Sequence, residues 1–291
     1  MSREMVNQGP GSLKTASSKS SAPKPGRSSA TRDQAAGLRR LLGNIGPRVL
    51  PVAGGADGQE RAAVVVELAV AAGAQGYSVV VLDQSRGNVA RMLGLRPRYE
   101  LHHLLSGEKQ FDEVALETVS GIRLVPAARG IAELASQPAH AMSFFHAFAR
   151  LDRPANLVIL NIEDPLTAAE LMPCVDAEVL LVANASNASI TGAYAHVKQM
   201  VLARGIVNYR VLICGVDDEC ESRRAFEKLA ATAGRFLRAR LNLGGLVPSS
   251  RHLGGASKNG DKAPAARAFQ QLVAGLPAWN LFESSVNAAT H

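Results

Sequence analysis

The chain has 291 residues, of which 47% are hydrophobic and 4% aromatic, and its formal net charge is +7. This length accommodates one large α/β domain or two small ones, and the low aromatic content favours helices packed on a parallel sheet over a β-sandwich. The sequence has no run of ~20 apolar residues that would span a membrane, and no apolar segment behind its N-terminal charges that would form a secretory signal.

The first 30 residues are predicted to form a disordered basic tail. They are rich in Ser, Lys, Pro and Gly, and residues 1–32 hold six Lys and Arg against one Glu, which accounts for +5 of the net charge. Such a segment cannot bury enough apolar surface to fold. Because no aromatic residue lies among these charges, we expect no specific nucleic-acid binding, and weak binding to anionic lipid is left open.

A short helix is predicted over residues 31–43. Thr31 or Ser29 can cap its start, and Gly43 can end it. Ala35, Leu38 and Leu42 recur at helical spacing and form one apolar stripe.

Residues 48–276 form the predicted α/β domain, in which apolar strand patterns alternate with helical patterns. This order, with continuous Val, Ile and Leu strands, predicts a doubly wound, mostly parallel sheet with helices on both faces. In such a sheet, ligands bind at the carboxyl ends of the strands. The predicted strands are 48–53, 78–82, 122–126, 157–162, 179–183, 209–214 and 243–247, and the main predicted helices are 61–75, 142–151, 189–204, 219–232 and 265–274.

The turn after the first predicted strand has the position of a phosphate-binding loop but few of its groups. It reads GGADGQERA over residues 54–62. A working loop needs glycines that let backbone N–H groups approach phosphate, a lysine for the β- and γ-phosphates, and a Ser or Thr for Mg²⁺. A glycine-rich turn between a strand and a helix is common, so the turn alone does not decide whether a nucleotide binds.

Residues 48–69 resemble, without a gap, the deviant Walker A region of the MinD/ParA ATPases, whose pattern is GKGGxGKT. In this alignment Gly55 and Gly58 stand at glycine positions, and Arg61 stands at the phosphate-binding lysine. Ala62 replaces the Mg²⁺-binding threonine, and Ala56 replaces the lysine that crosses the dimer interface. The resemblance implies a P-loop NTPase-like fold.

The replacements disfavour ATP. Asp57 and Glu60 replace glycines of the pattern and put carboxylates where a triphosphate would sit. The planar fork of Arg61 is not equivalent to a compact ammonium group. Each lost charged hydrogen bond is worth roughly 1.5–3 kcal/mol, so two or three losses would remove several orders of magnitude of affinity.

Three further segments resemble the family but lack its catalytic groups. Asp83 matches the first aspartate after the second strand, whereas Ser85 stands at the second aspartate. Asn161 stands at the metal-linked aspartate of the Walker B strand, and Cys214 at an adenine-reading asparagine. We therefore predict a pseudo-ATPase with no catalytic residue and no cofactor, with ATP and Mg²⁺ retained only if the degenerate site still binds. The vestigial nucleotide site comprises Gly55, Gly58, Arg61 and Asp83.

The scaffold motifs are closer to the family than the chemical ones. The segments GIRLVPAARGIAEL, EVLLVANASNASITGAYAHVKQM, LGGLVPSS and APAARAFQQL all resemble MinD/ParA motifs. The resemblance covers roughly residues 48 to 276.

The segment DQAAGLRRLL, which begins at Asp33, identifies the branch. It resembles the DQAxxLR segment that precedes the ATPase domain in the flagellar-number regulators, the FlhG/FleN-like branch. In that branch the segment is implied to bind a signal-recognition-type flagellar GTPase (FlhF-like) and to stimulate its GTP hydrolysis. The corresponding partner-binding positions are Asp33, Gln34, Ala35, Leu38 and Arg39.

A helix of this length that contains Gly37 is marginal alone, so it would order on a partner. Gln34 could then orient a water in the partner's active site, as glutamine does in several GTPases. The alternative is that the helix packs on the sheet edge, with Leu38, Leu41 and Leu42 in a satellite core.

Residues 277–291 are expected to form a C-terminal tail. Trp279, Leu281 and Phe282 form an apolar cluster there, but Pro277 interrupts it and no basic face accompanies it, unlike a membrane-surface helix. The three cysteines show no CxxC spacing, which indicates a reduced, cytoplasmic compartment, with peripheral placement at the membrane or a cell pole left open.

The leading hypothesis is thus a regulator of flagellar number or placement. Its partners would be the flagellar GTPase and, through the α/β body, a flagellar transcription regulator or switch-complex protein. Two alternatives remain: an active ATPase with unusual ligands, in which Asp83 or Asp164 holds Mg²⁺ through water, and a pseudo-ATPase polar scaffold. Since Ala56 lacks the interface lysine, we predict a monomer, or a dimer indifferent to nucleotide.

Overall fold

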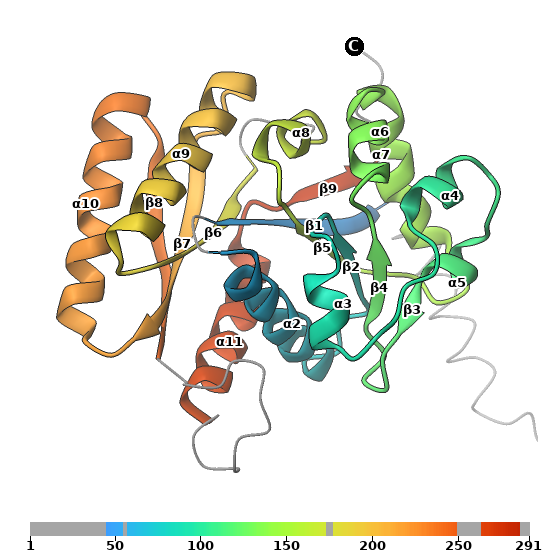
Figure 1. The fold of residues 1–291 in the computed structure, drawn as a ribbon, viewed down its shortest axis with the longest axis horizontal. Helices are drawn as coiled ribbons and strands as arrows, with labels where there is room; N and C mark the ends of the chain where they lie inside the picture. The colour runs from blue at the N-terminus through green and yellow to red at the C-terminus, as the bar shows by residue number, and fades with distance from the viewer. Residues whose placement is uncertain (1–44, 55–56, 173–176, 249–262, 286–291) are drawn as a thin grey trace, which may run out of the picture. The chain divides into compact units, whose positions relative to one another are not determined.

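The computed structural model describes residues 45–54, 57–172, 177–248 and 263–285. The predicted basic tail, the predicted helix 31–43 with its five partner-binding residues, and Gly55 lie outside the described residues. The described residues form the α/β body (Figure 1).

A nine-stranded sheet forms the centre of the body, in the order β3-β4-β2-β5-β1-β6-β7-β8, with β9 paired to β1. All pairings from β4 to β8 are parallel, whereas β3 pairs antiparallel with β4 and β9 antiparallel with β1. The predicted doubly wound, mostly parallel sheet is confirmed. The strands are β1 Ile45–Gly54, β2 Val79–Asp83, β3 Leu116–Glu117, β4 Arg123–Pro126, β5 Leu157–Asn161, β6 Val179–Asn184, β7 Asn208–Val216, β8 Arg240–Pro248 and β9 Phe282–Ser285.

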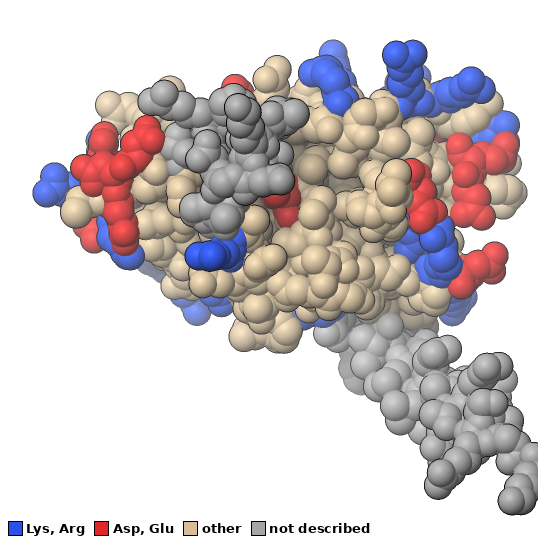
Figure 2. Space-filling view, turned by 90° about the horizontal axis from the view of Figure 1, so that it is seen from below, with Lys and Arg blue, Asp and Glu red and all other residues tan. Residues whose placement is uncertain are grey.

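Helices cover both faces of the sheet (Figure 1). One layer contains α2 (Gly58–Ala74), α3 (Asn88–Met92) and α11 (Ala263–Gly275). Seen from that side, charged side chains gather toward the margins, while other residues occupy much of the middle (Figure 2). The opposite layer contains α6 (Gly130–Ala135), α7 (Pro138–Ala147), α8 (Pro165–Glu170), α9 (Asn187–Arg204) and α10 (Glu219–Leu237). Shorter helices are α4 (Leu101–Leu105), α5 (Phe111–Val114) and the 3₁₀ turns η1 (Phe148–Arg150) and η2 (Leu276–Ala278).

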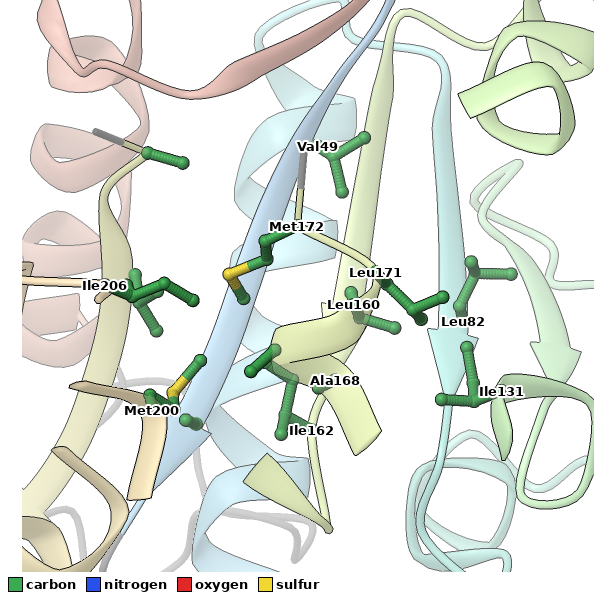
Figure 3. Packing of buried hydrophobic residues seen from close by; sticks show 14 of the residues in the cluster. Val49, Leu82, Ile131, Leu160, Ile162, Ala168, Leu171, Met172, Met200 and Ile206 are labelled. Carbon is green, nitrogen blue, oxygen red and sulfur yellow. The ribbon is translucent and has the colours of Figure 1, made fainter. Parts of the chain in front are cut away.

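Each layer buries its own apolar core against the sheet. Strands β2 and β5 are buried along their whole length, and β6 is buried up to its last residue, because parallel strands covered on both faces alternate their side chains between two cores. Figure 3 shows the core beneath α6 to α9, where Leu82 and Leu160 from the sheet lie near Ile131 and Leu171 from the helix layer.

The segment 277–291, which we expected to form a tail, contributes η2 and β9 in its described part. Trp279 and Leu281 are buried at 7% and 6% exposure. Arg48, a residue of β1, donates from its guanidinium to the carbonyls of Leu276 and Trp279, at 2.8 and 2.9 Å. The first and last described strands of the body are therefore paired with each other.

Candidate functional site

The candidate site lies at the carboxyl edge of the sheet, where β1 ends and α2 begins. Asp57 caps α2, and its carboxylate accepts from the amides of Gln59 and Glu60 at 3.0 and 2.8 Å. A Cβ at Gly58 would lie 2.8 Å from the Asn88 side-chain amide, so a larger residue here would displace the end of that side chain. Asp57 thus binds the amides that a phosphate-binding loop offers to its ligand.

Arg61, which stands at the phosphate-lysine position, points into the protein. It is 2% exposed, its Nε donates to Asn161 Oδ1 at 3.0 Å, and its guanidinium forms an ion pair with Glu163. Burial lowers the pKa of Arg61, and the charges of Glu163 and Asp83 oppose that shift. The cation is therefore held by groups of the chain itself.

Asp83 is the second buried charge of the site, at 1% exposure. One carboxylate oxygen, Oδ1, accepts from Asn161 Nδ2 at 2.7 Å and from the Ser85 amide and hydroxyl at 2.9 and 2.6 Å. Burial raises the pKa of Asp83, while these hydrogen bonds lower it. Asn161 thus links Arg61 to Asp83, and Ser85 extends the network.

Glu60 and Ala62 are two further residues of the turn at this site. The Asn184 side-chain amide donates to Glu60 Oε2 at 3.1 Å, and burial raises the pKa of Glu60. Ala62 is fully buried and brings no hydroxyl group. Cys214, at the adenine-strand position, is also fully buried, and burial raises the pKa of its thiol.

The structure brings three of the four predicted nucleotide-site residues, Gly58, Arg61 and Asp83, to this edge. Sequence reasoning did not include Glu163 and Asn184. Glu163 comes two residues after the end of β5 and Asn184 is the last residue of β6, and that position at the carboxyl edge was the available signal.

A cavity of about 770 Å³ lies beside the network, between the carboxyl ends of β2, β4 and β5. The Gln84 side-chain carbonyl accepts from the amides of Glu163 and Asp164 at 2.8 and 3.0 Å and orders one wall. The remaining lining includes Arg86 and Arg129 on the solvent side. The site therefore has open space next to it, but its buried charges are already paired.

The described residues contain no group of three or more His, Cys, Asp or Glu side chains placed to hold a metal ion. In the same part of the chain, no helix combines the length and the apolar character needed to cross a bilayer.

Comparisons with known proteins give the relatives of the chain. It is 33% identical over 219 residues to the antiactivator FleN of Pseudomonas aeruginosa, which covers 72% of this chain and 76% of that protein. No protein-family model matches.

Among solved structures, the MinD cell division protein of Aquifex aeolicus superposes with a TM-score of 0.59 at 17% identity, over 81% of this chain and 98% of that one. MinD of Pyrococcus horikoshii, solved with Mg-ADP, superposes with a TM-score of 0.55 at 17% identity, over 79% and 96%. These structural likenesses show the fold.

Proposed function

Since this chain belongs to the MinD/ParA family, in its FleN-like branch, we propose that it regulates flagellar number or placement by binding partners rather than by hydrolysing ATP. The relative is named an antiactivator, so a regulatory partner is part of the proposal. The body would contact a flagellar transcription regulator or a switch-complex protein.

The proposal that the nucleotide site is degenerate rests on the contacts of Arg61 with Asn161 and Glu163 of the same chain. To reach a phosphate, Arg61 would have to leave both Asn161 and Glu163. Its departure would leave the buried side-chain carbonyl of Asn161 without a donor, which costs roughly 1–3 kcal/mol. The carboxylates of Glu60 and Glu163 would then face the phosphates. The residues present therefore do not fit Mg-ATP.

Equilibrium dialysis of the full chain with labelled ATP and Mg²⁺ tests the degenerate site. We expect no binding at micromolar concentrations, and an unchanged mass in solution with and without ATP. The matched variant carries Arg61→Lys, Ala62→Thr and Glu60→Gly together, which restores the ammonium, the hydroxyl and the missing glycine, and it should bind more ATP than the parent. If the parent chain binds ATP with a low micromolar Kd, the alternative of an active ATPase is supported instead. In that alternative Asp83 would hold Mg²⁺ through water, and the neighbouring cavity would offer the space.

The DQAAGLRRLL segment supports an action on an FlhF-like GTPase, through Asp33, Gln34, Ala35, Leu38 and Arg39. A peptide of residues 1–47 should accelerate GTP hydrolysis by that GTPase. Gln34→Ala should lose the acceleration, while Leu38→Ser should weaken binding. Absence of any acceleration by both the peptide and the full chain would reject this mechanism and leave the dialysis result unaffected.

A further inference from the structure

The carboxyl-terminal ends of α9 and α10 share one edge of the molecule, opposite the candidate site. β6, β7 and β8 are parallel neighbours, so the helices that connect them both end at the amino edge of the sheet (Figure 1). The two connections also touch, because the Arg240 amide donates to the Val207 carbonyl at 2.6 Å. We define the amino-edge patch as Leu202, Arg235, Phe236, Arg238 and Arg240.

Two large apolar side chains of the patch are exposed to solvent. Leu202 near the end of α9 is 71% exposed, and Phe236 near the end of α10 is 65% exposed. Single exposed apolar residues are normal on a protein surface. Here they lie near the ends of two helices that finish at the same edge, and Phe236 has an arginine beside it, a composition that partner surfaces favour.

The patch is cationic and has no internal counter-charge. Neither residues 185–216 nor residues 228–248 contain an Asp or Glu. Arg235, Arg238 and Arg240 are exposed, and none of them lies within ion-pairing distance of a carboxylate in the described part of the chain. Glu170 on the neighbouring α8 is already paired with Arg204 at 3.3 Å. Stabilisation of the helix dipoles explains cations at these ends, but not the exposed Phe236 and Leu202.

Arg238 occupies a backbone conformation that favours glycine. Its φ of 55° is the only positive φ of a non-glycine residue among those described. The adjacent helix α9 ends in the same conformation with Gly205, at a φ of 68°. The end of α10 thus carries an exposed charged side chain at the position where α9 has glycine.

An arginine side chain lies beside the ring of Phe236. The Arg235 guanidinium carbon lies 5.2 Å from the ring centroid, within the range of a cation–π contact. This pairing of a guanidinium with an exposed ring suits a protein surface that offers a carboxylate next to an apolar contact.

We propose that the amino-edge patch binds an acidic segment of a partner protein in which carboxylates flank apolar side chains. The guanidinium groups pair with the carboxylates, and Phe236 and Leu202 pack against the apolar face. The patch shares no residue with the nucleotide site or with the DQAAGLRRLL segment.

Fluorescence anisotropy with the full chain tests the proposal. The probe is a labelled amphipathic peptide with Leu on one helical face and Glu on the other, and its control carries Lys in place of every Glu. Phe236→Ser and Arg238→Gly should each weaken binding of the Glu peptide by about tenfold, the loss of one strong contact. Arg238→Gly should not lower the unfolding temperature, because glycine suits the backbone there. Arg96→Gln and Val119→Ser, which change an exposed arginine and an exposed apolar residue elsewhere, should leave binding unchanged.

Three results would overturn the proposal. The Glu peptide fails to bind, or the Lys peptide binds equally well, or the control variants weaken binding as much as the patch variants. Tighter, patch-dependent binding to phosphatidylcholine vesicles containing phosphatidylglycerol, or to a single-stranded oligonucleotide, would assign the patch to lipid or nucleic acid instead.

Discussion

At the scale of single residues, the buried charge of Arg61 depends on partners that differ in exposure. Arg61 has a side chain that is 3% exposed, whereas the Glu163 side chain is 50% exposed. If the ion pair is broken, water can solvate the half-exposed Glu163 carboxylate, but it cannot reach the buried Arg61 guanidinium. The two halves of this ion pair should therefore not be equivalent in a stability measurement.

Glu163→Gln is expected to lower the free energy of unfolding by about 1–3 kcal/mol, because it weakens the counter-charge of a buried cation. Arg61→Met should cost less, since it removes the buried charge, leaves Glu163 to water and strands only the side-chain carbonyl of Asn161. Urea denaturation at neutral pH measures both changes. A larger loss for Arg61→Met would mean that Arg61 contributes chiefly through other contacts.

His102 predicts a pH dependence at the contact of α4 with α6. Its Nδ1 lies 2.9 Å from Glu133 Oε2, and this hydrogen bond raises the pKa of His102, with nearby glutamate charges adding to the shift. Because the folded pKa is raised, the stabilisation is present below about pH 6.5, the ordinary value, and is lost as the pH rises through the folded pKa.

The difference in unfolding temperature between the parent and His102→Gln should therefore be larger at pH 5.5 than at pH 8. His140→Gln serves as the matched control, because the hydrogen-bond partner of His140 is the neutral Gln137. Equal differences at both pH values for His102→Gln would contradict the ionic contribution.

At the scale of elements, two helical glycines have different effects: one allows close packing between helices, and the other adds flexibility to the unfolded chain. A Cβ at Gly130, the first residue of α6, would lie 2.5 Å from Leu101 Cγ and 2.6 Å from Leu101 Cβ on α4. A Cβ at Gly73 in α2 would meet nothing within 4 Å. The first glycine permits two helices to approach each other, whereas the second only adds freedom to the unfolded chain.

Gly130→Ala should destabilise the protein by about 1–3 kcal/mol, because α4 must move. Gly73→Ala should stabilise it by about 0.5–1 kcal/mol. Thermal unfolding of the two variants beside the parent gives the signs directly. A stabilising Gly130→Ala would show that α4 shifts without cost.

At the scale of the whole molecule, the segment after α11 belongs to the sheet. Deletion of residues 278–291 would remove β9 and expose the surroundings of the buried Trp279 and Leu281. With about 1.5–3 kcal/mol for each buried apolar side chain, the loss should be about 3–6 kcal/mol. Chemical denaturation followed by circular dichroism checks this. A truncated chain with unchanged stability would mean that β9 adds little to the body.

Much of the sheet could be predicted from the sequence, because parallel strands buried on both faces read as continuous apolar runs. The two-residue β3 and the four-residue β9 were missed, since neither is long enough to show a period and each depends on a partner strand distant from it in the sequence. In the candidate site, the turn from Gly58 to Arg61 was located by its motif. Its pairing with Glu163 was not, because an ion pair between residues 102 positions apart is set by the folded sheet.

The contact of β1 with β9 also bears on how the chain is made. Arg48 and Trp279, which are hydrogen-bonded in the body, are separated by 231 residues. At the usual pace of translation, about 5–20 residues per second, the ribosome releases the first strand some ten seconds or more before its last neighbour. During that interval one border of β1 has no native partner, and a chaperone that shields it would protect the nascent chain from aggregation.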